Sequence, residues 1–237
     1  MKGAIPLMGV GARNGAISTR DGENFQDGFE GWSSGEVLAA GATSINKLWT
    51  DVYTGGGSGI YIISASGRAQ VMLQSPLAST QVSGLETHAG LVLTNKWFKD
   101  FDMTVDVNTV ECLRQNFPVK NWERAWIMWR YYDAFHHYYF TMKNDGIEYG
   151  KKDNNLSVDA QLFLVTNGAI DIPLDSWYTV RIRMIGSFCN IWVSGNLLVS
   201  HGDTGVSGAT GAMYQGSVGL YNEDAHVLFD NVIINSV

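Results

Sequence analysis

The sequence predicts an all-β protein, a jelly-roll β-sandwich of two antiparallel sheets, and three observations support this fold class. Apolar residues alternate with polar ones in many short segments, as Met103, Val105 and Val107 do with their polar neighbours, and a period of two marks a strand with one buried face. Glycine makes up 27 of the 237 residues and proline only 4, so most turns are expected to use glycine. No window longer than about ten residues shows a 3.6-residue period, so helix is expected to be minor.

A dozen short segments are predicted as strands. They are residues 59–65, 69–74, 87–94, 100–110, 124–132, 136–143, 146–151, 160–165, 176–186, 188–195, 216–222 and 226–235. A tight Ser-Gly-Asn turn inside 191–198 predicts one further hairpin. Short strands joined by glycine-containing turns are typical of sandwiches and jelly rolls. We expect residues 25–237 to form a single domain and residues 1–24 to form an N-terminal arm.

The composition argues against several functional classes. The formal net charge is −7 and the pI is about 5.1, which disfavours nucleic acid as a partner. No apolar run approaches the roughly 18 residues that a membrane span needs, and residues 1–16 lack the apolar core of a signal peptide. Cys112 and Cys189 are the only cysteines, too few for a disulfide framework or a thiolate metal site. They form either one bridge or two buried free thiols.

Three segments carry a resemblance to a known family. Residues 127–151 combine an aromatic-Arg-Tyr-x-Asp pattern with a Tyr-x-Phe pair and Asn-Asp-Gly; residues 176–199 run from Trp-Tyr-Thr to Val-x-Gly; residues 216–234 close with Phe-Asp-Asn-Val. Together with the FQDGFEGW segment at 25–32, they resemble the concanavalin A-like lectin/glucanase superfamily in its laminin-G-like branch. The resemblance implies a jelly roll, a polysaccharide or oligosaccharide partner, and an extracellular or periplasmic location. It does not choose among sugar-binding modules, glucanases and polysaccharide lyases.

In the resembled fold, the outer face of one curved sheet forms the sugar cleft, so we assigned faces by alternation. Thr87, Ala89, Leu91 and Leu93 are expected in the core, and the same holds for alternate residues of the strands at 125–131, 136–143 and 147–151. The predicted outward set is Glu86, His88, Asp106, Asn108, Trp126, Met128, Arg130, His137, Tyr139, Thr141, Lys143 and Glu148. Its aromatic and planar polar groups suit a carbohydrate cleft; a solvated face, or a face covered by another chain, is the alternative.

Three chemistries compete at this predicted face. Glycoside hydrolysis needs two carboxylates, for which Glu86 and Glu148 are the best pair, with Asp106 in support, although the Glu-x-Asp-x-x-Glu run of related glucanases is missing. β-Elimination on a uronate polymer needs a base, an acid and a cation, which His88 or His137, Tyr139, and Arg130 or Lys143 would supply.

The third chemistry is binding without turnover, in which Trp126, Tyr139 and His137 contact a glycan while Asp106, Asn108, Arg130 and Lys143 add polar contacts. Glycosidic-bond cleavage is slightly favoured over binding because the set is rich in titratable groups, and hydrolysis is slightly favoured over elimination. A subunit of an extracellular filament or adhesin is a further alternative.

Other residues suggest metal binding or a minor role. The resemblance implies a structural calcium ion held by Asp27 and Asp230; the alternative for each is an aspartate that closes a turn. The adjacent His136 and His137 should point to opposite faces, which disfavours zinc. The segment at 221–226, with Glu223, is predicted to be a solvated turn or a rim of the cleft.

Overall fold

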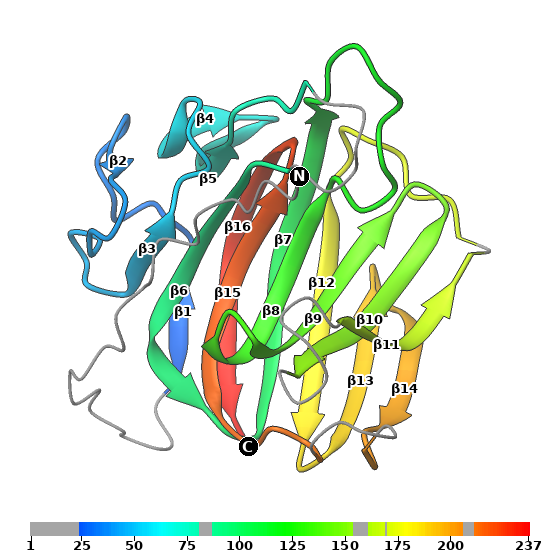
Figure 1. Ribbon diagram of the computed structural model, residues 1–237. Helices are drawn as coiled ribbons and strands as arrows, with labels where there is room; N and C mark the ends of the chain where they lie inside the picture. The colour runs from blue at the N-terminus through cyan, green and yellow to red at the C-terminus, as the bar shows by residue number, and fades with distance from the viewer. Residues whose placement is uncertain (1–23, 81–86, 154–160, 169, 206–210) are drawn as a thin grey trace, which may run out of the picture.

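The computed structural model describes residues 24–80, 87–153, 161–168, 170–205 and 211–237, and these contain strands but no helix. The predicted all-β jelly-roll class is confirmed (Figure 1). One sheet is formed by β1 (Phe25–Asp27), β2 (Val37–Leu38), β4 (Gly59–Ala65), β5 (Arg68–Ser75), β7 (Phe101–Cys112), β12 (Tyr178–Ile185), β13 (Phe188–Val193), β14 (Asn196–Gly202) and β16 (Ala225–Ser236). The other contains β3 (Trp49–Tyr53), β6 (Ala89–Phe98), β8 (Ala125–Asp133), β9 (His136–Lys143), β10 (Gly146–Asp153), β11 (Gln161–Asn167) and β15 (Gly216–Glu223).

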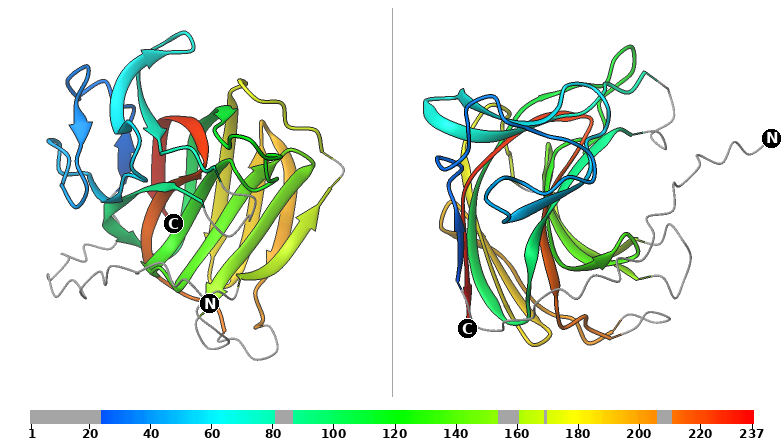
Figure 2. Two further views of the ribbon diagram at one scale, coloured as in Figure 1. Left: turned by 45° about the horizontal axis from the view of Figure 1, so that its top comes forward. Right: turned by 90° about the vertical axis from the view of Figure 1, so that its left-hand side faces the viewer.

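The two sheets are antiparallel throughout and pack face to face, as the edge-on view of Figure 2 shows. In the nine-stranded sheet the order is β14-β13-β12-β7-β16-β5-β4-β2, with β1 paired to β16; in the seven-stranded sheet it is β11-β10-β9-β8-β15-β6-β3. Strands distant in sequence therefore lie side by side. The last two strands are both internal: β15 lies between β8 and β6 in one sheet, and β16 lies between β7 and β5 in the other.

The core between the sheets is aromatic. Trp129 stacks on Tyr138 and Tyr149 at centroid distances of 5.9 and 5.7 Å, and all three side chains are fully buried. Met103, Val105 and Val107 of β7 face this core as the alternation predicts. Burial of such large rings is the main stabilising contribution that a sandwich of this kind offers.

In β6 the predicted faces are reversed. Val92 lies in the core between the sheets, whereas Leu91 and Leu93 pack on the outside, against a second cluster that includes Trp126 and Tyr139. Leu91 is fully buried, as a core residue would be, but the assignment of Leu91 and Leu93 to the core between the sheets was wrong, because both faces of β6 are covered. Alternation assigns a face only where one side is polar.

Arg130 lies inside the protein rather than on the predicted outer face. Its φ of +47° marks a bulge, at which the register between β8 and β9 shifts. The bulge turns Tyr131 outward, where it stacks on His137 at 5.2 Å. Period-two alternation fails here because an extra residue reverses the phase of the strand.

The buried guanidinium of Arg130 is well supplied with acceptors. It donates to the carbonyl oxygens of Lys99, Gly186 and Met213, at 2.6–3.0 Å, and to the Asp100 carboxylate at 3.0 Å. Gly216 leaves room for the bulge, since a Cβ there would lie 2.4 Å from the Arg130 carbonyl carbon. One side chain thus joins the β6–β7 turn, the β12–β13 turn and the segment before β15.

Cys112 and Cys189 are free thiols rather than a bridged pair. Cys189 is buried in the core, and the Cys112 thiol donates to the Glu123 carbonyl at 3.4 Å. Over the described residues, no helix is long and apolar enough to cross a membrane. The predicted N-terminal arm at 1–24 lies outside the described residues except for its last residue.

We predict that Arg130→Met lowers the free energy of unfolding by about 3 kcal/mol, because it leaves several buried acceptors without a donor. Urea denaturation monitored by tryptophan fluorescence measures this. Arg183→Met is the matched control: Arg183 has a 46% exposed side chain and should change stability by less than about 0.5 kcal/mol. Equal effects of the two substitutions would contradict the role given to Arg130.

Candidate functional site

The outer face of the seven-stranded sheet brings together most of the predicted cleft residues. The strand register places one residue from each strand in a row across this face. That row consists of Thr166, Glu148, Thr141, Trp126, Tyr221, Leu91 and Tyr53. The adjacent row consists of Phe163, Gly150, Tyr139, Met128, Gly219, Leu93 and Thr50. We call the two rows the outer-face site.

Four aromatic rings form a continuous chain within the outer-face site. Tyr53 packs edge-on against Tyr221 at 6.5 Å and Tyr221 edge-on against Trp126 at 5.8 Å, while Trp126 and Tyr139 are tilted to each other at 4.9 Å. The indole N–H of Trp126 donates to the Trp122 carbonyl at 2.8 Å. These contacts fix three buried rings, and they hold the half-exposed ring of Tyr53 in place at the end of the chain.

Glu148 stands at one end of the aromatic chain. It accepts a hydrogen bond from the Tyr139 hydroxyl at 3.0 Å and forms an ion pair with Lys143 at 2.9 Å. Gly150 makes this arrangement possible, because a Cβ there would lie 2.4 Å from the Tyr139 hydroxyl oxygen. Burial and the negative charge of Glu148 raise the pKa of Tyr139 well above its usual range, so this hydroxyl stays protonated.

A second carboxyl group, Glu223, lies near the middle of the aromatic chain. The Tyr221 hydroxyl donates to it at 2.5 Å. Burial raises the pKa of Glu223 to about 7, and its charge, like that of Glu148, acts on Tyr139. The outer-face site therefore holds one ion-paired carboxylate and one carboxyl group that is partly protonated at neutral pH, a combination that supports acid–base chemistry.

Buried ion pairs fix the turn that carries Glu223. The fully buried Asp224 accepts hydrogen bonds from the His88 backbone N–H at 3.1 Å and from Arg114 at 3.3 Å, and Arg114 is also paired with Glu123. His88 thus lies next to this turn, with its Nδ1 3.7 Å from Asp224. The segment expected to be a solvated turn or a rim is a buried, hydrogen-bonded part of the site.

His137 lies on the same face, but its side chain is buried. Only 5% of the residue is exposed, and burial lowers its pKa to about 4, so the ring is neutral at physiological pH. Its Nδ1 lies 3.1 Å from the Asp133 carbonyl oxygen, which favours the tautomer with a proton on Nδ1.

Access to the outer-face site is restricted to its rim. Trp126, Tyr139 and Glu148 are 3%, 0% and 6% exposed, whereas Tyr53 and Trp122 are each 38% exposed. The buried rings and the carboxylate hold the site together. The rings that a ligand can reach lie at the edges of this face: they are Tyr53, Trp122 and, on β11, Phe163, which is 60% exposed.

The predicted site residues thus divide into two groups. Trp126, His137, Tyr139, Lys143 and Glu148 share one face, with His88 beside the turn that follows β15. Three others lie elsewhere: Arg130 is internal, and Asp106 and Asn108 belong to β7 of the other sheet. Glu86 lies outside the described residues. The carboxyl pair of the site is therefore Glu148 with Glu223, and the predicted pair of Glu148 with Glu86 stays a prediction.

Sequence reasoning missed Tyr53 and Tyr221 as site residues, and it named Glu223 only as part of a solvated turn or a rim of the cleft. The predicted strand at 216–222 ended one residue before Glu223; in the structure β15 includes it, so Tyr221 and Glu223, two residues apart, share a face. Tyr53 lies in β3, which the pattern did not predict. Which strands lie beside each other depends on long-range pairing, so the row that joins these residues is not visible in the sequence.

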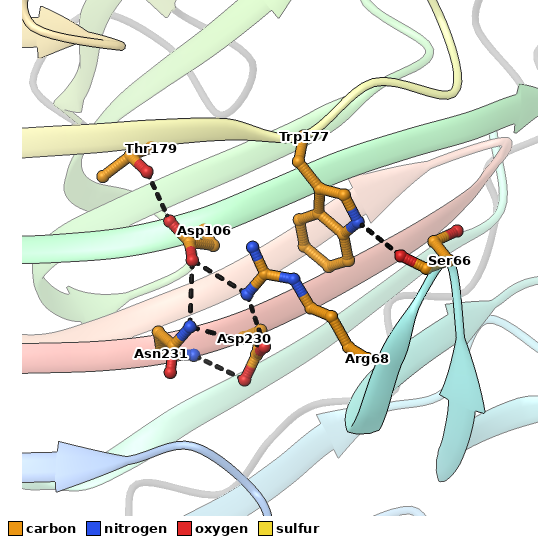
Figure 3. Close-up of polar contacts among 7 residues, drawn as sticks. All are labelled: Ser66, Arg68, Asp106, Trp177, Thr179, Asp230 and Asn231. Atoms are coloured by element: carbon orange, nitrogen blue, oxygen red, sulfur yellow. Dashed lines mark hydrogen bonds and ion pairs between the residues drawn. The ribbon is translucent and has the colours of Figure 1, made fainter.

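Asp106 and Asp230 take part in a separate charge network on the outer face of the nine-stranded sheet (Figure 3). Arg68 donates to Asp106 at 2.8 Å and to Asp230 at 2.5 Å, and its guanidinium lies 3.9 Å from the Trp177 ring centroid. Asn231 and Thr179 also donate to Asp106. Partial burial acts to raise the pKa of Asp106, but these hydrogen bonds and the Arg68 charge hold it below its usual range.

Asp27 and Asp230 provide a poor donor set for calcium. Asp27 accepts hydrogen bonds from the Phe29 backbone N–H, the Trp32 and Trp49 indoles and Asn46, at 2.8–3.0 Å, while Asp230 is paired with Arg68. Among the described residues, no three histidine, cysteine or acidic side chains are grouped to hold a metal ion. Calcium binding stays a prediction that the resemblance alone supports.

Comparisons with known proteins agree with this architecture. The model of a family described as "3-keto-alpha-glucoside-1,2-lyase-like domain" matches residues 15–235. A search of curated proteins found no significant match. Among solved structures, the chain is similar to the carbohydrate-binding module CBM66 from Bacillus subtilis, with 16% identity, a TM-score of 0.54, and coverage of 85% of this chain and 99% of that one.

Two further solved structures share the fold. One is a Bacillus subtilis protein of unknown function with a galectin-like fold, at 10% identity and a TM-score of 0.56, with 86% of this chain and 98% of that chain covered. The other is a Bacillus licheniformis β-glucanase, at 11% identity and a TM-score of 0.50, with 91% and 99% covered. These similarities confirm the concanavalin A-like jelly roll.

The raised pKa of Glu223 predicts a pH-dependent stability. Because the folded-state pKa of about 7 exceeds the ordinary pKa of 4.5, the folded state binds more protons than the unfolded state, and stability falls as the pH rises from 4.5 to 7. We predict that Glu223→Gln removes part of this fall, on the order of 2 kcal/mol. Urea midpoints at both pH values measure it, and Glu30→Gln, at an exposed position, should leave the fall unchanged. An unaltered slope in Glu223→Gln would contradict the assignment.

Proposed function

Because the chain belongs to the 3-keto-alpha-glucoside-1,2-lyase-like domain family, we propose that it is a carbohydrate-active protein that binds a saccharide across the outer face of its seven-stranded sheet. The observation that carries this proposal is the aromatic chain from Tyr53 to Tyr139, whose tyrosine hydroxyls donate to Glu223 (from Tyr221) and to Glu148 (from Tyr139). Sugar rings offer apolar faces to aromatic side chains and hydroxyl groups to carboxylates. The outer-face site combines both kinds of group.

The exposed rings at the rim are the expected contact points. Tyr53 packs against Tyr221, and the Trp122 carbonyl holds Trp126, so the two rim side chains join the site through different buried rings. A saccharide that spans the rim would contact both. Fold likeness to a carbohydrate-binding module and to a β-glucanase is compatible with this use of the face.

A second candidate function, cleavage of the glycosidic bond, is favoured by the two environments of Glu148 and Glu223. A carboxyl group with a pKa of about 7 can give or accept a proton at neutral pH, and a carboxylate paired with Lys143 supplies a fixed negative charge. In hydrolysis Glu223 would act as the general acid. In elimination it would remove the proton next to a carbonyl group, a C=C bond would form as the C–O bond to the departing sugar breaks, and the protonated Glu223 would return the proton to the departing oxygen, so that no water is consumed.

We predict that Tyr53→Ala and Trp122→Ala each weaken polysaccharide binding by about tenfold, because each removes an exposed ring of the binding surface. Affinity electrophoresis in gels that contain a panel of neutral and uronate polysaccharides measures binding. The control is Phe188→Ala, which removes a 46% exposed ring from a strand of the other sheet. If both rim variants were retarded by the polysaccharides as strongly as the wild type, the outer-face site would be excluded as the binding surface.

For bond cleavage, we predict that Glu223→Gln and Glu148→Gln each lower the rate by at least about 100-fold while binding persists, because the loss of a positioned proton donor or acceptor has an effect of that size. The panel is assayed for reducing ends and for near-ultraviolet absorption by unsaturated products, and it includes 3-keto-glucosides. Reducing ends without absorption indicate hydrolysis, and absorbing products indicate elimination. Cleavage at the wild-type rate in both variants would remove this mechanism.

A further inference from the structure

A second candidate site is a pocket at the end of the sandwich, with a lining that contains no residue of the aromatic chain. It lies where β8 turns into β9 and where residues 212–215 lead into β15, and its volume is about 340 Å³. The residues that matter for its chemistry are Arg130, Tyr132, His136, Met213, Tyr214 and Gln215. Trp126 and Tyr132 are six residues apart on β8, which corresponds to roughly 20 Å along the strand. The pocket is therefore distinct from the outer-face site.

Two exposed tyrosines line this pocket. Tyr132 is 66% exposed and Tyr214 is 63% exposed, far more than any ring of the aromatic chain. Tyr132 is held by edge contacts with Trp97 at 5.9 Å and His136 at 6.5 Å, and Tyr214 lies 6.0 Å from the Arg130 guanidinium. Each ring is held on one side by these contacts and is open to solvent on the other, so each offers a free face on which a ligand can stack.

The polar groups of the pocket are few and fixed. Asp133 accepts from the Phe135 backbone N–H at 2.7 Å and lies 2.8 Å from Nδ1 of His136. This contact orients the imidazole and assigns Nδ1 to Asp133, so that Nε2 is the ring nitrogen left for a ligand. Gln215 adds an amide that can both donate and accept.

The charges around the pocket disfavour an anionic ligand. The guanidinium of Arg130 is directed at three backbone carbonyls and at Asp100, so its donors are already used. The Asp133 carboxylate beside His136 would repel a second negative charge. An uncharged ligand with apolar faces and hydroxyl groups fits these walls.

We propose that this pocket is a second saccharide-binding site, which holds one uncharged sugar ring against Tyr132 and Tyr214 with His136 and Gln215 as hydrogen-bonding partners. Its volume is near the lower end of the roughly 300–1,000 Å³ typical of small-molecule sites, which suits a single ring. Two sites on one chain allow a polysaccharide to bind at both, and the second contact then forms at a high effective concentration. The pocket does not depend on the function of the outer-face site.

Titration of the full chain with methyl α-glucoside, followed by amide chemical shifts, tests this proposal. We expect shifts at Tyr132, Tyr214 and Gln215, an at least tenfold loss of affinity in Tyr132→Ala and in Tyr214→Ala, and retained affinity in Tyr214→Phe. Both alanine variants alter exposed side chains, so they should unfold at the wild-type temperature. Leu197→Ala, at a 53% exposed position of the other sheet, is the matched control.

The outcomes separate the two sites. Tyr53→Ala should leave the pocket shifts unchanged, so the pocket can be supported even if the outer-face site binds nothing. Absence of shifts at the pocket amides in the wild type would overturn the proposal, as would shifts that persist in both alanine variants. Glucuronate that binds the pocket as tightly as the glucoside would overturn the assignment of an uncharged ligand.

Discussion

The arrangement of the seven-stranded sheet depends on one buried cation. The guanidinium of Arg130 lies in the interior, where a charge is costly unless its donors are satisfied. Its acceptors come from two turns and from the segment before β15, which are far apart in sequence. Only one register of β8 brings them within reach. The bulge that results reverses the phase of the strand, so that Trp126 and Met128 before it and Tyr131 after it all face outward. The burial of Arg130 therefore determines which side chains of β8 lie on the outer face that carries the proposed function.

The two outer faces of the sandwich use their polar groups differently. On the nine-stranded sheet, Arg68 lies between Asp106 and Asp230 and under the Trp177 ring, so both the charges and the ring are already engaged. On the seven-stranded sheet, Glu223 forms no close ion pair, of the kind that Arg68 makes, with any described side chain; burial raises its pKa to about 7 although the charge of Lys152 acts to lower it. A carboxyl group whose pKa is raised by burial marks a functional face more clearly than one held in a close ion pair. For this reason the proposal is placed on the seven-stranded sheet, and Asp106, which the sequence analysis gave as a supporting carboxylate of the cleft, is not part of it.

The fold could be predicted from local patterns, and the site only in part. The strands at 59–65 and 136–143 match β4 and β9 residue for residue, because alternation and turn residues are local signals. His137, Tyr139 and Glu148 were placed on the correct face for the same reason. Arg130 and Leu91 were misplaced, since a bulge and a strand covered on both faces break the alternation rule. Tyr221 could not be matched with Trp126, because their pairing joins strands about a hundred residues apart and is set by topology.

The pairing of β1 with β16 has a mechanical consequence. The two strands are antiparallel, with Phe25 opposite Ile234 and Asp27 opposite Val232, so tension applied at the two outer ends would peel the hydrogen bonds apart one after another rather than shear them together. Peeling would stop at Asp27, whose carboxylate is anchored by two indoles, an amide and a backbone N–H. Under tension between its two ends, the first residues of β1 would therefore separate from β16 at low force. Further separation would require breaking the hydrogen bonds of Asp27, and the sheet that carries the aromatic chain would stay folded.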